Sequence, residues 1–215
     1  MKRYKLTNQD MQTYGGFQWE IGKWYRTDGK GELCSYGWLH CYSHPLIAML
    51  HNPIHTGIKN PRLWKVEVCG QSKTDDGMKE GWTEMRLVKE LAIPKITNTN
   101  RVAYGILCAL AVYDNPDYVS WAEDWLSGSD RTEKSARSRG AMALAAEASA
   151  SWALEAAAAA WPIEGSVRAW SVKKSTRTME IAERAAWAAA NAVERMANHT
   201  PINLPQLARK AMKVS

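Results

Sequence analysis

The sequence predicts an α+β fold, in which a small domain with a mixed or antiparallel sheet (residues 1–95) precedes an all-α, alanine-rich helical bundle (residues 96–215). Two observations separate the halves. The first half contains short apolar runs interrupted by glycine, whereas the second contains long alanine- and tryptophan-rich runs with few helix breakers. Short alternating runs are typical of strands and long uninterrupted runs of helices, so the change of pattern after Pro94 predicts a domain boundary.

The strands of the N-terminal half are predicted from short runs of apolar and aromatic residues. A strand is expected at residues 4–6 and another over residues 17–25, with turn-forming residues at 27–31 after it. Apolar and polar residues alternate from residue 63 to residue 69, which predicts a half-buried strand, and residues 82–91 show a similar pattern.

A short helix is predicted between these strands. Ser43 is its expected N-cap and Pro45 lies in its first turn, where a missing backbone donor costs nothing. We expect loops over residues 52–61 and 72–81.

Long helices are predicted for the alanine-rich half. Asp130 followed by Glu133 is typical of a capping box, so a helix should begin there and run to Trp161, where Pro162 ends it. A second alanine-rich helix follows Gly165, and alanine at the contact lets the two pack closely, within one chain or across a homodimer. Shorter helices are predicted over residues 101–113, 115–126 and 204–212.

The positive charge of the chain is concentrated at the starts of the two long helices. The net charge is +6, which favours association with nucleic acid or with an acidic protein surface. Two interpretations remain open, namely solvated helix ends that keep the bundle soluble and a binding surface. The binding candidates are Arg131, Lys134, Arg137, Arg139, Arg168, Lys173, Lys174 and Arg177.

No stretch of the sequence is long and apolar enough to predict a membrane span. The longest apolar run, residues 102–112, is too short to cross a bilayer. The first residues are polar, so we expect the protein to stay in the cytoplasm where it is made, with its four cysteines as thiols.

Thiol and imidazole side chains are concentrated in one short segment, at Cys34, His40, Cys41, His44, His51 and His55. Their spacing matches neither paired zinc-binding cysteines nor a helical metal-binding histidine pair, so we assign no metal and no cofactor. Cys34 and Cys41 are expected in the core. Pro53 is expected to break the helical register between His51 and His55.

Aromatic residues are dense in the first 40 positions, at Tyr14, Phe17, Trp19, Trp24, Tyr25, Tyr36 and Trp38. Such side chains stack on bases or on a nicotinamide, or fill a small core. With a single phenylalanine in the chain, most of them are expected in the core.

Two segments, GFQWEIGKWY at residues 16–25 and ELCSYGWLHC at residues 32–41, resemble a domain of unknown function found in bacteriophage proteins. VEVCG at 66–70 and LVKEL at 87–91 are also similar to its pattern. The second half, with WAEDWLSGSDR at 121–131, is similar to the helical regions that often follow this domain and, more loosely, to helical domains of immunity proteins. The resemblance implies a phage-encoded accessory protein.

The lack of a complete catalytic motif favours a protein that acts by binding. We expect an inhibitor of a bacterial defence complex, such as an anti-CRISPR protein, with a host protein or ribonucleoprotein complex as partner and nucleic acid as a further partner class. One alternative is an ADP-ribosyltransferase-like enzyme with His40, Tyr42 and Glu84 as catalytic candidates, by analogy of element order. Others are a virion component and a protein that sequesters a nucleotide signal where aromatic and cationic side chains converge.

Overall fold

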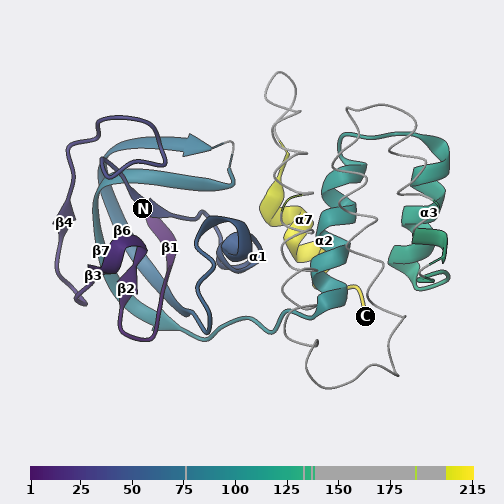
Figure 1. Cartoon of the computed structure of the whole chain (residues 1–215), viewed down its shortest axis with the longest axis horizontal. Coiled ribbons are helices and arrows are strands. Elements are labelled where there is room, and N and C mark those ends of the chain that lie inside the picture. The colour runs from purple at the N-terminus through teal and green to yellow at the C-terminus, as the bar shows by residue number, and fades with distance from the viewer. Residues whose placement is uncertain (76, 133, 137, 139–186, 188–201) are drawn as a thin grey trace. The chain divides into compact units, whose positions relative to one another are not determined.

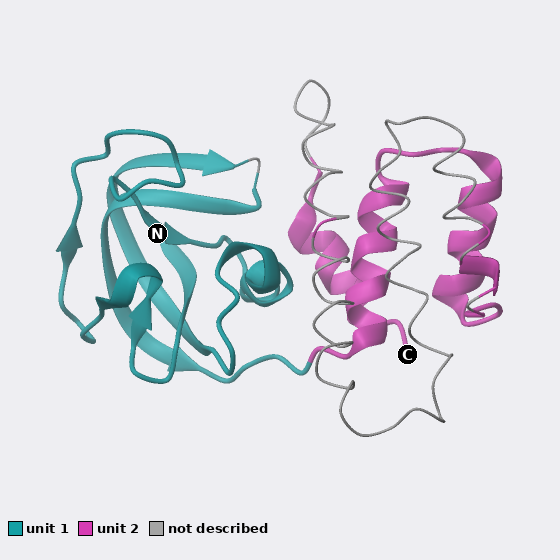
Figure 2. Ribbon diagram, in the orientation of Figure 1, with its two compact units in different colours: residues 1–95 teal, residues 96–215 magenta. Residues whose placement is uncertain are grey.

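The computed structural model describes residues 1–75, 77–132, 134–136, 138, 187 and 202–215 (Figure 1). The chain divides into two compact units, Met1–Lys95 and Ile96–Ser215 (Figure 2). Unit 1 contains an antiparallel sheet and one α-helix, and the described α-helices of unit 2 are α2, α3 and α7. This combination confirms the predicted α+β class. The two long alanine-rich helices fall almost wholly outside the described residues.

The main sheet of unit 1 has the strand order β1-β6-β7-β4, and β5 also pairs with β7. All of these pairs are antiparallel. The strands are β1 (Lys2–Thr7), β4 (Tyr25–Arg26), β5 (Leu39–Cys41), β6 (Arg62–Asp75) and β7 (Lys79–Leu91). A separate pair, β2 (Gln12–Thr13) and β3 (Phe17–Gln18), encloses the short 3₁₀ turn η1 (Tyr14–Gly16). The predicted strands at residues 4–6, 63–69 and 82–91 are confirmed.

The hairpin between β6 and β7 is longer than the sequence predicted. The expected loop over residues 72–81 is wrong, because pairing continues to Asp75 opposite Lys79. The turn closes with Met78 N donating to the Asp75 carbonyl at 2.7 Å and Gly77 at φ 86°. The extra length lets β7 pair with β5, so that His40 lies opposite Gly81.

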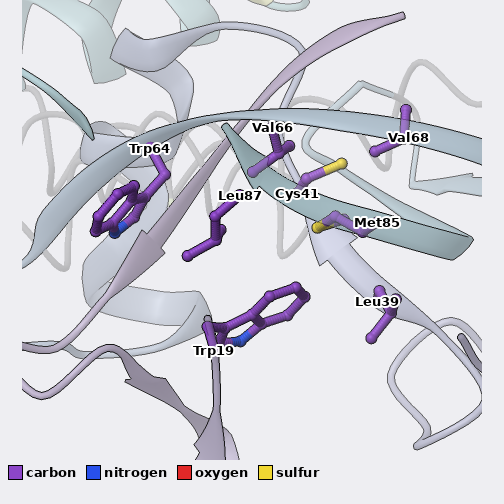
Figure 3. Close-up of a cluster of buried hydrophobic side chains, with 8 residues drawn as sticks. All are labelled: Trp19, Leu39, Cys41, Trp64, Val66, Val68, Met85 and Leu87. Atoms are coloured by element: carbon purple, nitrogen blue, oxygen red, sulfur yellow. The ribbon is translucent and has the colours of Figure 1, made fainter. Parts of the chain in front are cut away.

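Buried side chains from β5, β6 and β7 form a hydrophobic cluster with Trp19 in the core of unit 1 (Figure 3). Alternation along β6 directs Trp64, Val66 and Val68 inward, as predicted, and the Trp64 indole donates to Thr7 Oγ1 at 2.9 Å. Their neighbours in the core are Trp19, Leu39, Cys41, Met85 and Leu87. Burying a polar indole is tolerated here because its N–H has a hydrogen-bond acceptor.

The predicted strand over residues 17–25 is wrong. The chain instead bends between β3 and β4, with Gly22 at φ 81°, a conformation that strongly favours glycine. Ile21 makes only an isolated bridge to Leu87. The bend matters because it places Trp19 in the core while Phe17 stays 40% exposed.

Helix α1 of unit 1 spans Pro45–His55 and differs from the prediction at both ends. His44, not Ser43, is the N-cap, since its Nδ1 accepts from Leu46 N at 3.2 Å. The helix also continues through Pro53, which lies two residues before its end. Proline lacks a backbone N–H, so the last turn has one hydrogen-bond donor fewer. His51 and His55 thus share one helix face, with ring centroids 5.3 Å apart.

Replacing the cap tests this assignment. We expect His44→Ala to lower the free energy of unfolding by about 1 kcal/mol, the usual cost of losing an N-cap. Ser43→Ala is the matched control and should have no measurable effect. Urea denaturation of both variants would measure the difference. A larger loss in Ser43→Ala than in His44→Ala would contradict the assignment.

Unit 2 begins with helix α2 (Asn98–Leu110), which Thr97 caps in a reciprocal capping box with Asn100. The helix therefore begins and ends three residues before the bounds that the sequence predicted, 101–113. Asn100 is buried, and its amide donates to the carbonyls of Ala211 and Val214 at 3.0 and 2.9 Å, which ties α2 to the C-terminal helix α7 (Leu204–Ala211).

Helix α3 (Pro116–Ser127) confirms the helix predicted over residues 115–126; Asn115 caps it and Gly128 ends it at φ 88°. Within the described segments, no helix is both long and apolar enough to cross a membrane.

Candidate ligand-binding site

A pocket of about 720 Å³ opens in unit 1, within the size range of small-molecule sites. It is built from β1, the η1 turn, the loop from β4 to β5, β5 itself, the C-terminal end of α1 and the start of β7. Six aromatic side chains line it: Tyr14, Phe17, Trp19, Tyr36, Trp38 and Tyr42. Four basic side chains also line it: Lys5, His40, His55 and Lys79.

The aromatic lining has a buried part and an exposed part. Trp19 and Trp38 are 1% and 8% exposed, and their indoles donate to Thr13 Oγ1 and to the Gly31 carbonyl. Tyr14 and Tyr36, in contrast, are 85% and 84% exposed. Exposed aromatic groups on the lining of a pocket are available to stack on a ligand that enters it.

The expectation that most of these aromatics fill the core is therefore wrong for Tyr14, Phe17, Trp24 and Tyr36, which are all exposed. The physical reason is local. Tyr14 and Tyr36 lie on short glycine-containing segments that the core does not cover, and the sequence pattern gives no indication of this.

Lys5 is the most unusual group in the pocket. It is 6% exposed, its Nζ donates to the His40 carbonyl at 2.6 Å, and it lies 4.7 Å from the centroid of the Trp19 ring. Among the described residues, no carboxylate lies within 4.0 Å of this amine. Burial lowers the pKa of Lys5 to about 8, against a small opposing effect of Cys41.

His40 is close enough to Lys5 and Lys79 for both charges to act on its ring. Its Nε2 donates to the Leu33 carbonyl, which fixes the proton of the neutral ring on Nε2. Burial lowers the pKa of His40 below its usual value; the Leu33 hydrogen bond opposes this, and the charges of Lys5 and Lys79 add to it. Lys79 Nζ approaches Cys34 Sγ at 2.8 Å and Asp75 at 4.0 Å.

His55 forms the α1 side of the pocket. Its Nδ1 accepts from the Tyr42 hydroxyl at 3.2 Å, and the two rings stack at an interplanar angle of 16°. Burial, followed by the charges of Lys79 and His40, lowers the pKa of His55 to about 4. His51, one turn earlier, is fully buried, and burial lowers its pKa to about 3.

The three candidates for the transferase alternative are not brought together. His40 and Tyr42 line the pocket, whereas Glu84 does not and instead accepts from Arg26 Nε at 3.0 Å. Cys41 is buried as expected, with burial raising the pKa of its thiol to about 12. The expectation for Cys34 is wrong, because this thiol is exposed.

The basic candidates of unit 2 are only partly described. Arg131 is engaged within the unit, since it donates to the carbonyls of Trp125 and Ser215 at 2.9 and 2.6 Å and lies over the Trp125 ring. Lys134 is exposed. The remaining six lie outside the described residues: Arg137, Arg139, Arg168, Lys173, Lys174 and Arg177.

Sequence reasoning missed Lys5 and Lys79. A lysine between Tyr4 and Leu6 on a short strand matches the pattern of a solvent-facing residue, and Lys79 was placed in a loop. For His55 the sequence suggested a metal ligand or a residue that caps or packs locally, not a ligand-binding residue. What makes these residues a site is tertiary contact between segments up to 74 positions apart, for which one sequence carries no signal.

Residues 1–99 match a family model described as a domain of unknown function, DUF7666. The matched segment contains the whole of unit 1, including every residue that lines the pocket. Comparison of the chain with curated proteins and with solved structures gave no match. The similarity to DUF7666 is therefore confined to the half of the chain that carries the sheet and its pocket.

Proposed function

We propose that unit 1 binds a small planar aromatic molecule of the nucleotide class, and that the protein acts by sequestering this ligand. The observation that carries the proposal is the exposure of Tyr14 and Tyr36 on the lining of the same pocket as buried Trp19 and Trp38. Stacking of a base on an aromatic side chain contributes about 1–3 kcal/mol per base. The buried amine of Lys5, which has no carboxylate within reach among the described residues, suits the negative charge of a nucleotide.

Sequestration fits this geometry better than the other hypotheses. The inhibitor hypothesis relies on basic helix starts that lie mostly outside the described residues, and the transferase hypothesis needs Glu84, which is paired with Arg26 away from the pocket lining. In the form we propose, a phage accessory protein would withdraw a nucleotide signal from the host cytoplasm.

The test is calorimetry of the full chain with adenosine and guanosine nucleotides. We expect at least one to bind, and Tyr36→Ala and Tyr14→Ala each to weaken its affinity by about 5- to 150-fold, the range that corresponds to one lost stacking contact. Trp24→Ala is the matched control, because Trp24 is 38% exposed, lies over Arg86 and does not line the pocket. The proposal fails if no nucleotide binds, or if both tyrosine variants bind like the unmodified protein.

A further inference from the structure

We infer that the ligand of this pocket carries at least two phosphate groups, held by Lys5, His40, Lys79 and His55, and that its binding is coupled to proton uptake by the two histidines. The inference rests on the proposed nucleotide class and adds the charge of the ligand and the groups that recognise it.

Three of these basic side chains are linked through one short series of contacts. Lys5 Nζ donates to the His40 carbonyl at 2.6 Å. The ring of His40 donates to the Leu33 carbonyl, and the next residue, Cys34, contacts Lys79 Nζ at 2.8 Å. The basic groups therefore lie along one part of the lining, which suits an extended anion better than a single compact charge.

His55 adds a fourth basic group from α1. The positive charges of Lys79 and His40 lower the pKa of His55 further, beyond the effect of burial. The charge of His55 in turn lowers the pKa of the buried His51. The hydroxyl of Tyr42 donates to its Nδ1, so in this arrangement its Nε2 carries the proton of the neutral ring.

Few acidic groups balance this cluster. Among the described residues, the only carboxylate within 4.0 Å of any of the four is Asp75, at that limit from Lys79. The nearby Glu80 is already engaged, since it accepts from Arg3 Nε at 2.5 Å and from the Trp82 indole at 2.9 Å. A ligand with one negative charge would neutralise only the charge of Lys5. An oligophosphate carries further negative charges, which favour the protonated form of the histidines.

The direction in which affinity changes with pH follows from the protonation of His40 and His55 in the ligand-free protein. Without ligand both histidines are neutral at pH 7, because burial and the neighbouring cations hold their pKa values below the usual range. A bound oligophosphate raises those pKa values, so the complex holds more protons than the free protein. Affinity should therefore rise as the pH falls.

The experiment is calorimetry of the full chain, without divalent cations, against adenosine, AMP, ADP, ATP and inorganic tripolyphosphate. We expect affinity to rise about tenfold with each added phosphate, the effect of one or two charge-assisted hydrogen bonds. Titrations in two buffers of different ionisation enthalpy between pH 7 and 6.5, where Lys5 is already charged, should show uptake of about one to two protons. Because the ligand's own phosphate protonates near pH 6, the doubly substituted variant His40→Gln, His55→Gln provides the baseline and should lose this uptake.

Lys79→Met should also weaken the affinity for ATP far more than the affinity for adenosine. Lys89 is an exposed lysine on the same strand, and Lys89→Met should change neither affinity. Equal affinity for adenosine and ATP, or equal proton uptake in the histidine variant, overturns the inference and leaves the proposed function standing. Binding of tripolyphosphate with proton uptake but of no nucleotide would support the anion site and reject the nucleotide class. If no probe binds, both proposals fail.

Discussion

Replacing Lys5 by methionine is expected to stabilise the ligand-free protein while it weakens nucleotide binding. The folded-state pKa of Lys5 is about 8, below its ordinary 10.5, so the folded protein holds this proton less tightly than the unfolded chain. Stability is therefore lost as the pH falls from 10.5 to 8 and is lower by a constant amount below that range. At about 1.4 kcal/mol per pH unit, the charged amine costs roughly 3 kcal/mol at neutral pH.

Methionine keeps the length of the side chain and removes the charge. The variant loses the hydrogen bond to the His40 carbonyl, worth about 1 kcal/mol. We therefore expect a net gain of about 2 kcal/mol in the free energy of unfolding at pH 7. This gain should vanish near pH 10, where the amine of the unmodified protein is neutral in the folded state.

Hydrogen exchange of peptides from β6 and β7 measures the free energy of unfolding of unit 1 separately from that of unit 2. Lys89→Met is the control for replacing any strand lysine and should leave exchange unchanged. The nucleotide affinity of Lys5→Met should fall by about 100-fold, as expected when a buried charge-assisted contact is lost. A variant that is less stable than the unmodified protein would show that Lys5 acts mainly as a structural hydrogen-bond donor.

Local sequence signals predicted the elements of the fold well and the pocket poorly, for a physical reason that Lys5 illustrates. Strand alternation and helix caps depend on neighbours within a few positions, which is why Asn115, Gly128 and the inward face of β6 were predictable. The burial of Lys5 depends on Trp19 and β5, which reach it only in the folded chain.

The pair of histidines on α1 shows the same limit at shorter range. The predicted break of the helical register at Pro53 is wrong, because the burial of Ile47, Leu50 and His51 holds the helix together to His55. Tertiary burial overrode the local signal and placed two histidines on one face beside the pocket.

Lowering the pH from 7 to 5 is expected to destabilise unit 1 by about 4 kcal/mol, with His51 and His55 as the cause. Their folded-state pKa values are about 3 and 4, against 6.5 for the ordinary ring. The unfolded chain therefore binds protons below pH 6.5 that the folded chain refuses, so stability is complete above pH 6.5 and is lost as the pH falls. Each histidine contributes about 2 kcal/mol over this interval, and somewhat less for the partly exposed His55.

His51→Gln and His55→Gln should each remove about half of this pH dependence, measured as the difference in β6 and β7 hydrogen exchange between pH 7 and pH 5 in each variant. The comparison within one variant removes any constant cost of the substitution. Full pH dependence in both variants would assign the effect to other groups.

The two histidines should also respond differently to ligand. His55 lines the pocket and His51 does not, so a bound oligophosphate should restore acid stability through His55 and not through His51. Ligand protection at pH 5 that is reduced in His55→Gln and kept in full in His51→Gln would link the anion site to the stability of α1. Protection that is equal in both variants would mean that the anion lies away from His55.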